Sequence, residues 1–226
     1  MLTLNHISYM ILEMIRENHI VDDENLSILM IENWINMKRD QYIRNSLSTN
    51  PNDRIDLNLY QSIDVTVAVG NVTNNGNYPY SNNTTQLTKI VTSSTTIPNI
   101  IEGKSGPLVL SVESADLMKL PFSLVDYDEL RFVGNGKFNN NLIYGALRDN
   151  KLYFKYNPFF DTYTTVKLKA VFNDPREVSG FDVSSSRYPA NEGLVEYIKN
   201  GIFDKDIRMV LGGKTDTVND ASGVIK

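Results

Sequence analysis

Residues 22–47 constrain the fold more than any other stretch, because they predict one long helix. After Asp23 the chain runs for about 24 residues without glycine or proline, roughly twice the length of an average globular helix. Asp22 and Asp23 supply side-chain acceptors for the free N–H groups at the start of such a helix. Its apolar residues fall on two faces, roughly 135° apart when successive residues turn by about 100°. The first face carries Leu26, Met30, Trp34 and Met37, and the second carries Ile28, Ile31, Ile35 and Tyr42.

Two apolar faces leave two interpretations of this helix. A helix at the surface of a small monomer needs only one apolar face to cover the core. The helix is therefore either central and enclosed by its own domain, or it packs one face on the core and offers the other to a second molecule. The helix alone does not separate these interpretations.

Residues 3–18 predict a shorter amphipathic helix before the long one. Its apolar face has the helical repeat Ile7, Met10, Ile11, Met14 and Ile15. A short connection at residues 18–21 separates the two helices. We therefore expect them to pack as a helical hairpin over residues 1–50.

Residues 51–178 predict an antiparallel β-domain. Several helix-breaking residues at 48–52 end the helical region. Apolar residues then alternate with polar ones from Ile55 to Thr73, with a bend at 60–62. Further short strands follow, including residues 122–133, a tight hairpin at Asp149-Asn150 and a last strand at 165–172. About six to eight short strands at this spacing are typical of a β-sandwich or an open barrel.

Residues 179–212 predict a C-terminal helical segment that joins the N-terminal helices. Leu194, Val195 and Ile198 recur at helical spacing, and Gly212-Gly213 is a natural stop. The remaining residues, 213–226, are polar and are expected to form a flexible docking tail. We therefore predict an α+β fold in which helices from both chain ends form an adaptor-like body beside the central β-domain.

The composition excludes several kinds of catalytic and metal chemistry. The chain has no cysteine and only two histidines, which removes thiolate zinc sites, iron–sulfur clusters and cysteine nucleophiles. Asp126, Asp128 and Glu129 cluster as in a glycoside hydrolase or a calcium site, with Asp126 and Asp128 on one strand face. No second acidic cluster completes either site, so a solvated acidic edge is favoured. We predict no enzyme, no cofactor and no metal.

Charge and hydrophobicity limit the partners. A formal net charge of −5 disfavours extensive binding of nucleic acid. No run approaches the roughly 18 apolar residues that span a bilayer, and residues 1–17 lack the cleavage site of a signal peptide. We expect a protein that is made in a cytoplasm and has no membrane partner.

Five stretches, in order along most of the chain, carry a family resemblance. They are QYIRNSL at 41–47, LPFSLVDYDELRFVGNGKFNNNLIY at 120–144, VFNDPREV at 171–178, YPANEGLVEYIK at 188–199 and DIRMVLGGKTDTVNDASG at 206–223. Together they resemble a ring protein of crAss-like bacteriophages infecting Bacteroides, a virion component of the head–tail connector of short-tailed phages. The resemblance implies a ring of about twelve copies that bridges portal and tail and contacts neighbouring ring proteins. It also implies assembly in the bacterial cytoplasm and a lumen through which DNA passes without sequence-specific binding.

The resemblance and the second apolar face together favour a subunit contact. A subunit of a closed heterologous ring presents two different surfaces, one to each neighbour. A C-terminal tail that becomes ordered only when it docks suits a complex whose components assemble one after another. The candidate residues for contacts with subunits or partners are Leu26, Met30, Trp34, Met37, Tyr78, Tyr80, Thr217, Val218, Val224 and Ile225.

Two further hypotheses stay open. The alternative to a ring is a carbohydrate- or receptor-binding β-module on a helical oligomerisation stalk, with Tyr78, Tyr80, Phe159 and Phe160 as candidate stacking groups. A more distant hypothesis is a glycan-cleaving enzyme that uses Asp126 and Asp128. Loss of glycan binding on Tyr78→Ala would support the first, and unchanged function after both aspartates become asparagine would remove the second.

Overall fold

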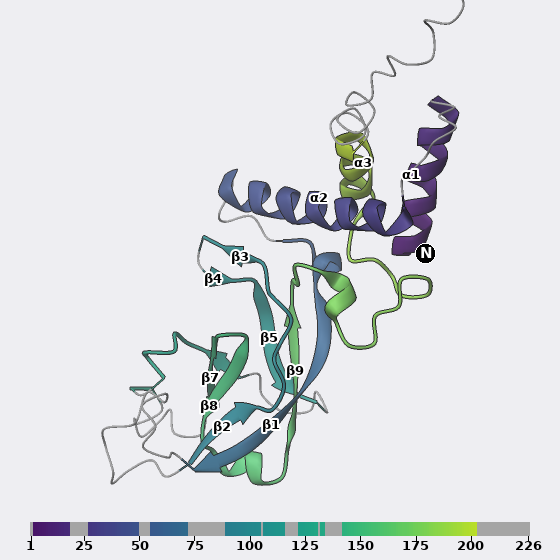
Figure 1. Ribbon diagram of the computed structural model, residues 1–226. Coiled ribbons are helices and arrows are strands. Elements are labelled where there is room, and N and C mark those ends of the chain that lie inside the picture. The colour runs from purple at the N-terminus through teal and green to yellow at the C-terminus, as the bar shows by residue number, and fades with distance from the viewer. Residues whose placement is uncertain are drawn as a thin grey trace, which may run out of the picture. The chain divides into compact units, whose positions relative to one another are not determined.

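The chain divides into two units in the computed structural model, one helical and one built on a sheet (Figure 1). The structure describes residues 2–18, 27–49, 55–71, 89–104, 106–115, 122–130, 132–133 and 142–202. Residues 1–54 and 182–226 belong to the helical unit, and residues 55–181 belong to the β unit. The helices come from both ends of the chain and the strands from its middle, so the predicted α+β fold is confirmed.

The described part of the helical unit contains three helices, each with a side-chain cap at its start. They are α1 (Leu4–Asn18), α2 (Ile28–Thr49) and α3 (Glu192–Gly201). The caps accept a free N–H of the first turn, which stabilises a helix start. They are Thr3 before α1, Ser27 before α2 and Asn191 before α3, with N···O distances of 3.2, 3.2 and 2.8 Å. None of the described helices has an apolar stretch long enough to cross a membrane.

The described part of the long helix starts later than the sequence predicts. The predicted caps Asp22 and Asp23 lie outside the described residues. Ser27 instead accepts the N–H of Met30 with its hydroxyl and the N–H of Ile31 with its carbonyl, so α2 begins at Ile28. The predicted C-terminal helix is present as α3, and residues beyond Ile202 lie outside the described part.

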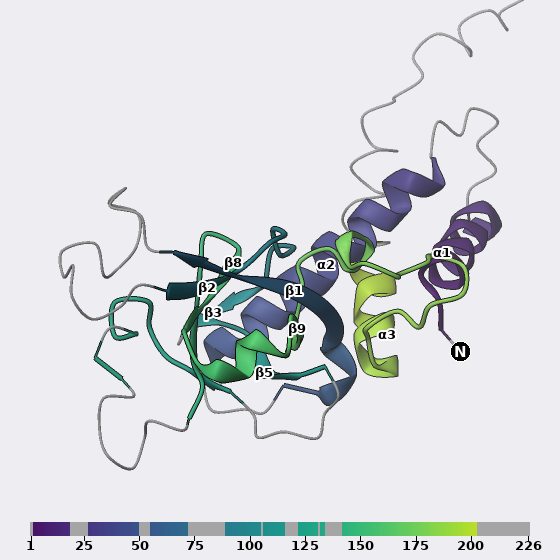
Figure 2. The same cartoon turned by 90° about the horizontal axis from the view of Figure 1, so that it is seen from below.

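Apolar side chains from all three helices are buried in the helical unit. Figure 2 shows α1 and α3 beside α2, and both contact it. The buried apolar helix residues are Leu4, Ile7, Ile11, Leu12, Ile31, Ile35, Ile43, Leu194, Val195 and Ile198. Removal of this area from water is the main force that holds the helices together.

The segment at residues 182–191 connects the three helices through hydrogen bonds. The N–H of Tyr188 donates to the carbonyl of Leu2 at 2.9 Å, and the N–H of Asn5 donates to Val183 at 3.1 Å. The Tyr188 hydroxyl donates to Asn36 Oδ1 in α2 at 2.7 Å. One short segment therefore binds the start of α1 and the middle of α2 before it leads into α3.

The β unit is built on one seven-stranded sheet, which is antiparallel except where β6 pairs with β7. Its strand order is β5-β9-β1-β2-β8-β7-β6. The strands are β1 (Gln61–Asn71), β2 (Lys89–Ser93), β5 (Val109–Ser114), β6 (Ser123–Leu124), β7 (Tyr144–Arg148), β8 (Lys151–Lys155) and β9 (Thr165–Ala170). The short strands β3 (Glu102–Gly103) and β4 (Gly106–Pro107) pair separately, and the 3-10 turns are η1 (Leu57–Leu59), η2 (Pro158–Asp161) and η3 (Pro175–Glu177).

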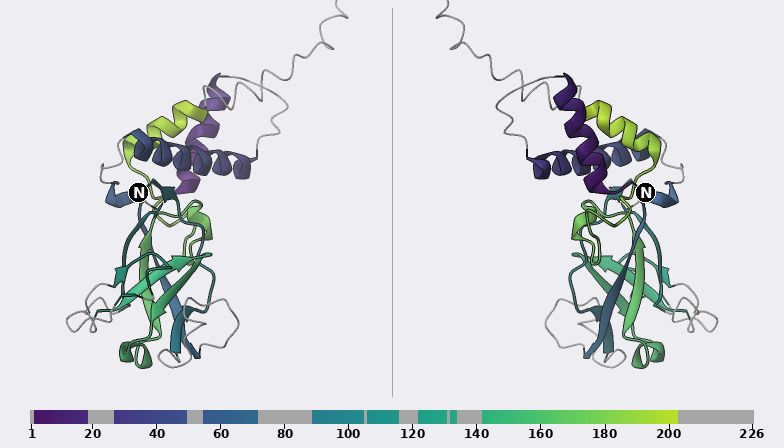
Figure 3. Two further views of the ribbon diagram at one scale, coloured as in Figure 1. Left: turned by 90° about the vertical axis from the view of Figure 1, so that its left-hand side faces the viewer. Right: turned by 90° about the vertical axis from the view of Figure 1, so that its right-hand side faces the viewer.

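One hydrogen bond nearly closes this sheet into a barrel. The end strands β5 and β6 come together because the N–H of Phe122, next to β6, donates to Val112 in β5 at 2.9 Å. Figure 3 shows the curled sheet from two sides. The barrel core includes Ile63, Val65, Val67, Val91, Val112, Phe122, Leu152, Phe154, Phe160, Val166, Leu168 and Phe172. The prediction of an antiparallel β-sandwich or open barrel is therefore confirmed, and the sheet is of the barrel kind.

Two segments predicted as strands have other structures. Residues 57–59 form η1, because Asp56 accepts the N–H of Asn58 at 2.9 Å and starts a turn. The described part of residues 122–133 contains only the two-residue strand β6, after which the N–H groups of Glu129 and Leu130 donate to the Asp126 carbonyl and form a turn. The prediction of a single strand face carrying Asp126 and Asp128 is therefore wrong.

The predicted tight hairpin is confirmed between β7 and β8. Asp149 and Asn150 have φ angles of 50° and 56°. Two consecutive positive φ angles define the turn type whose twist matches that of hairpin strands, and asparagine and aspartate tolerate them best. The register of the pair is Arg148 opposite Lys151 and Gly145 opposite Phe154.

Candidate assembly surface

The outer side of α2 carries exposed apolar side chains in its N-terminal half. Leu29 is 61% exposed and Met37 is 51% exposed. Met30 and Trp34 are half-buried. These four residues lie within about 140° of one another around the helix. We call them the α2 outer face.

A polar region borders the α2 outer face toward the C-terminus of the helix. Arg44 Nε lies 3.0 Å from Asp40 Oδ2, one helical turn apart. Gln41, Asn45 and Ser48 are exposed on the same half. Apart from exposed Asn33, which lies between Leu29 and Met37, this side of α2 has an apolar centre with a polar border, the arrangement found in protein–protein interfaces.

The inner side of α2 carries buried polar and charged residues. Glu32, Asn36, Lys38 and Arg39 are all at least nine-tenths buried. Arg39 is fully buried, and its Nε donates to the carbonyl of Pro189 at 2.9 Å. A buried guanidinium without acceptors costs several kcal/mol. Rotation of α2 about its axis would break the hydrogen bond between Arg39 and Pro189. This bond therefore helps to determine which apolar side of α2 turns outward.

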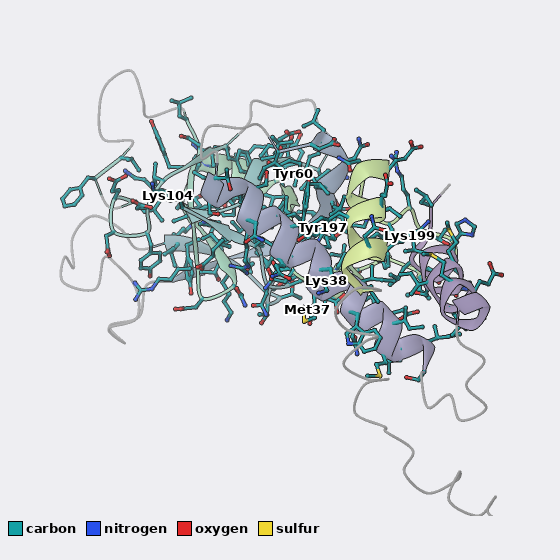
Figure 4. All side chains as sticks on the ribbon, turned by 90° about the horizontal axis from the view of Figure 1, so that it is seen from above. Met37, Lys38, Tyr60, Lys104, Tyr197 and Lys199 are labelled. Carbon is teal, nitrogen blue, oxygen red and sulfur yellow. The ribbon has the colours of Figure 1, made fainter. Side chains whose placement is uncertain are left out.

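Figure 4 shows how the sides of α2 differ where α3 crosses it. Lys38 and Tyr197 lie at the crossing, and Met37 lies on another side of α2. Two distances agree with this view. The rings of Tyr42 and Tyr197 are 5.0 Å apart, and a Cβ on Gly201 would lie 3.6 Å from Lys38 Cδ. Helix α3 therefore covers the side of α2 that carries Lys38 and Tyr42.

The structure brings together three of the predicted interface residues. Met30, Trp34 and Met37 lie on the α2 outer face. Leu29 was not among the predicted residues, although it is the most exposed member of the face. Its position flanks the predicted stripe, so a wider stripe would have included it. The other predicted residues lie outside the described part: Leu26, Tyr78, Tyr80, Thr217, Val218, Val224 and Ile225.

The acidic cluster of the sequence analysis lies in a turn that covers the outside of the barrel. Asp126, Asp128 and Glu129 are exposed, while Leu130 of the same turn is fully buried against Tyr144 and Ala146 of β7. Within the described residues, no three acidic or histidine side chains come close enough to hold a metal ion. The turn therefore forms a small second core rather than a metal or carboxylate site.

Phe159 and Phe160, the two described residues proposed for glycan stacking, have structural contacts instead. Phe160 is 2% exposed and belongs to the barrel core. Phe159 stacks on Tyr163 with ring centroids 4.4 Å apart, and it packs against the same core. A buried ring offers no face to a sugar, so Phe160 is removed from the glycan-binding hypothesis.

The α2 outer face is the kind of surface through which proteins that assemble contact one another, and comparison with known sequences identifies the family. A family model described as phage tail ring protein 2 matches residues 6–223, which is nearly the whole chain. The chain therefore belongs to this family of ring proteins of crAss-like phages. The comparison with curated proteins gave no match.

Membership of this family confirms the resemblance seen in the sequence. A tail ring protein is a structural component of the virion and associates with copies of itself. The family description indicates a structural role rather than an enzymatic one. Self-association requires contact surfaces, and the α2 outer face has the composition expected of one.

Proposed function

We propose that this protein forms a closed ring of about twelve copies in the head–tail connector of a short-tailed phage. The ring bridges portal and tail and encloses the channel through which DNA is ejected. It assembles in the bacterial cytoplasm and contacts the portal and neighbouring ring proteins. Its net charge of −5 suits a lumen along which DNA slides without binding.

The observation that carries the proposal is the α2 outer face. Within a family of tail rings, a cluster of exposed Leu29 and Met37 with half-buried Met30 and Trp34 is best explained as a subunit contact. Burial of the part that is still exposed, about half of each side chain, would contribute about 1–2 kcal/mol at Leu29 and at Met37. Met30 and Trp34 extend the same contact.

Other predicted residues have proposed roles in docking. In this proposal, residues 213–226 dock on the adjacent ring or the portal through Thr217, Val218, Val224 and Ile225. Leu26 extends the helix contact, and Tyr78 and Tyr80 contact a neighbouring subunit. Tyrosine suits such positions because it combines a large contact area with a polar tip.

Imaging of the purified chain with the portal protein of the same phage tests this proposal. We expect rings in electron micrographs and a matching mass by light scattering. Met37→Glu places a charge in the subunit contact and should abolish rings, while Asn45→Glu, on the polar half of the same helix, should retain them. A wild-type chain that stays monomeric at high concentration, with and without portal, would contradict the proposal.

Deletion of residues 213–226 tests the docking role separately. The truncated chain should keep its fold and form rings, but its binding to the portal or the adjacent ring should weaken at least tenfold. Unchanged affinity would remove the tail from the docking contact.

A further inference from the structure

We propose that residues 207–211 of one copy pair as a short β-strand with the open seam of the barrel in the next copy of the ring. The open seam is the place between β5 and β6, at Leu110 and Leu124, where the two strands are not paired. The inference rests on the proposed ring and goes beyond it, because it names a second contact between subunits and the chain segment that makes it.

A β-bulge separates β5 from β6 at the seam. The N–H of Phe122 donates to Val112, and the next rung of an antiparallel pair would join Leu124 to Leu110. That rung is absent among the described residues. Strand β5 has a bulge at Leu110, where its register with β9 shifts, and a bulge bends a strand away from its neighbour. The barrel is therefore closed at Val112 and open at Leu110.

Strand β6 has free backbone groups that face the seam. It pairs with β7 through alternate residues, since the N–H of Ser123 donates to Ile143 and the N–H of Val125 donates to Gly145, both at 2.9 Å. The N–H and C=O of Leu124 therefore point to the other side, toward β5, and they bond to no other described residue. A strand edge with free groups of this kind is a template for pairing with a further strand.

Core-facing side chains are incompletely covered beside the seam. Val109, Leu124 and Leu147 pack on the barrel core but are only half-buried, and Leu110 is 44% exposed. The core side chains of β2, β8 and β9, by contrast, are almost completely buried. A strand added at the seam, with apolar side chains on one face, would remove this area from water.

Residues 207–211 have the sequence that such a strand requires. Ile207, Met209 and Leu211 alternate with Arg208 and Val210, so the first three lie on one face of an extended chain. Neither glycine nor proline interrupts the run. Elsewhere outside the described residues, no stretch has three large apolar side chains at alternate positions.

The seam favours a strand over a longer α3. A short apolar run fits either a helix or a strand, so the sequence alone allows residues 207–211 to extend the helix. A helix satisfies its own backbone and cannot use the free groups of Leu124, whereas an added strand gains main-chain hydrogen bonds and places alternate side chains on the core.

The requirements of a ring favour the next copy as the acceptor. Each subunit of a closed heterologous ring presents two different surfaces, one to each neighbour. Residues 207–211 would supply one of these surfaces and the open seam the other. Every copy then donates one strand and receives one.

A thiol scan of assembled rings tests the strand. The chain has no cysteine, so each variant carries a single thiol. In rings, Ile207→Cys, Met209→Cys and Leu211→Cys should react with a maleimide at least tenfold more slowly than Arg208→Cys and Val210→Cys. In a helix, positions 207 and 211 share a face and 209 lies opposite. Protection of 207 and 211 without 209, or equal reactivity at all five positions, would overturn the inference.

Cross-linking identifies the acceptor. In rings of Leu110→Cys/Met209→Cys, a short bismaleimide should join thiols of different chains and give a ladder of covalent multimers on a denaturing gel. Thr164→Cys/Met209→Cys is the matched control and should give no ladder, since Thr164 is exposed at the opposite end of β9 from the seam. A link within one chain, detected by mass spectrometry without a ladder, would place the strand on its own barrel and contradict donation to the next copy.

Electron micrographs of the same samples separate this inference from the proposed function. If the wild-type chain forms no rings, with or without portal, the proposed function fails and the strand exchange fails with it. If rings form but Leu110→Cys/Met209→Cys gives neither a ladder nor a link within the chain, only the strand exchange is overturned. Far-UV circular dichroism checks that each variant is folded.

Discussion

Arg39 and Pro189 are 150 residues apart in the chain, yet Arg39 Nε donates to the Pro189 carbonyl at 2.9 Å. Arg39 lies on the inner side of α2, and Pro189 lies just before α3. The bond joins the N-terminal and C-terminal parts of the helical unit and sets the rotation of α2. The outward position of Met37 thus depends on a polar contact on the opposite side of the helix.

Arg39→Met should destabilise the helical unit. The change keeps much of the apolar stem but removes a charged donor from a fully buried site, at an expected cost of about 1.5–3 kcal/mol in the free energy of unfolding. Trp34 is the single tryptophan and lies on α2, so its fluorescence during urea unfolding reports on this unit. Arg44→Met is the matched control, since its exposed ion pair contributes about 0–1 kcal/mol. Equal effects of the two changes would contradict the role of Arg39.

Gly145→Ala should destabilise the β unit. Gly145 in β7 lies opposite Phe154 in β8, and a Cβ at this position would come within 2.6 Å of the Phe154 ring. Phe154 is fully buried in the barrel core, so the ring has little room to move, and the expected cost is about 1–3 kcal/mol. In Gly70→Ala, the control, the nearest atom to the new Cβ is 3.9 Å away.

Thermal unfolding, followed by the circular dichroism signal of the β-sheet, measures the effect of Gly145→Ala. The thermal midpoint of the β unit should fall for Gly145→Ala and stay close to the wild type for Gly70→Ala. The Trp34 transition should not move in either variant. If Gly145→Ala leaves the thermal midpoint unchanged, the Phe154 ring can move aside to accommodate the added Cβ, which would contradict this prediction.

Phe160→Ala distinguishes a core residue from a glycan-stacking residue. Loss of a buried phenylalanine typically costs about 3–5 kcal/mol, because it leaves a cavity among the remaining core side chains. The rings of Phe122 and Phe154 lie 6.0 and 5.2 Å from that of Phe160 and would border this cavity. Denaturation should show this loss, and a stable variant that fails only in binding sugar would restore the glycan hypothesis.

The turn at Asp182 should make stability depend on pH. A hydrogen bond from the Ser185 hydroxyl, and a second from the Ser184 N–H, hold the pKa of the Asp182 carboxyl below its ordinary value of 3.8. The same turn positions Val183, whose carbonyl accepts the N–H of Asn5. A lowered folded-state pKa means that the ionised carboxylate stabilises the fold above the unfolded-state pKa, and that this contribution disappears as pH falls through the folded-state value.

Comparison with Asp182→Asn measures this pH dependence. At neutral pH the wild type should have the higher thermal midpoint. The difference should shrink as the pH falls below 3.8 and the wild-type carboxyl becomes protonated. A difference that stays constant from neutral to acidic pH would show that the charge of Asp182 plays no part.

The sequence predicts most of the fold because helices and strands leave periodic patterns. The period-two run at Ile63, Val65 and Val67 predicts β1, and Asp149-Asn150 predicts the β7–β8 hairpin, since both signals are local. The strand predicted at residues 122–133 is wrong because Leu130 is buried by a turn, which produces an apolar position without strand pairing. An apolar residue shows that a position is buried, but not which backbone conformation buries it.

The candidate surface could be predicted only in part. The two-faced pattern identified Met30, Trp34 and Met37, but the choice of the outward face depends on Arg39 and Asn36. Their partners, Pro189 and Tyr188, are distant in the chain and follow no periodic pattern.

Thiol labelling of Met37→Cys tests the ring contact most directly. The chain has no cysteine, so the introduced thiol is the only site of reaction. In free subunits Cys at position 37 should react readily with a maleimide, since Met37 is 51% exposed. In assembled rings the rate should fall at least tenfold, while an exposed control, Lys151→Cys in the β unit, reacts at the same rate in both forms. Equal reactivity of position 37 in subunits and rings would contradict the account, because it would place the α2 outer face outside the subunit contact.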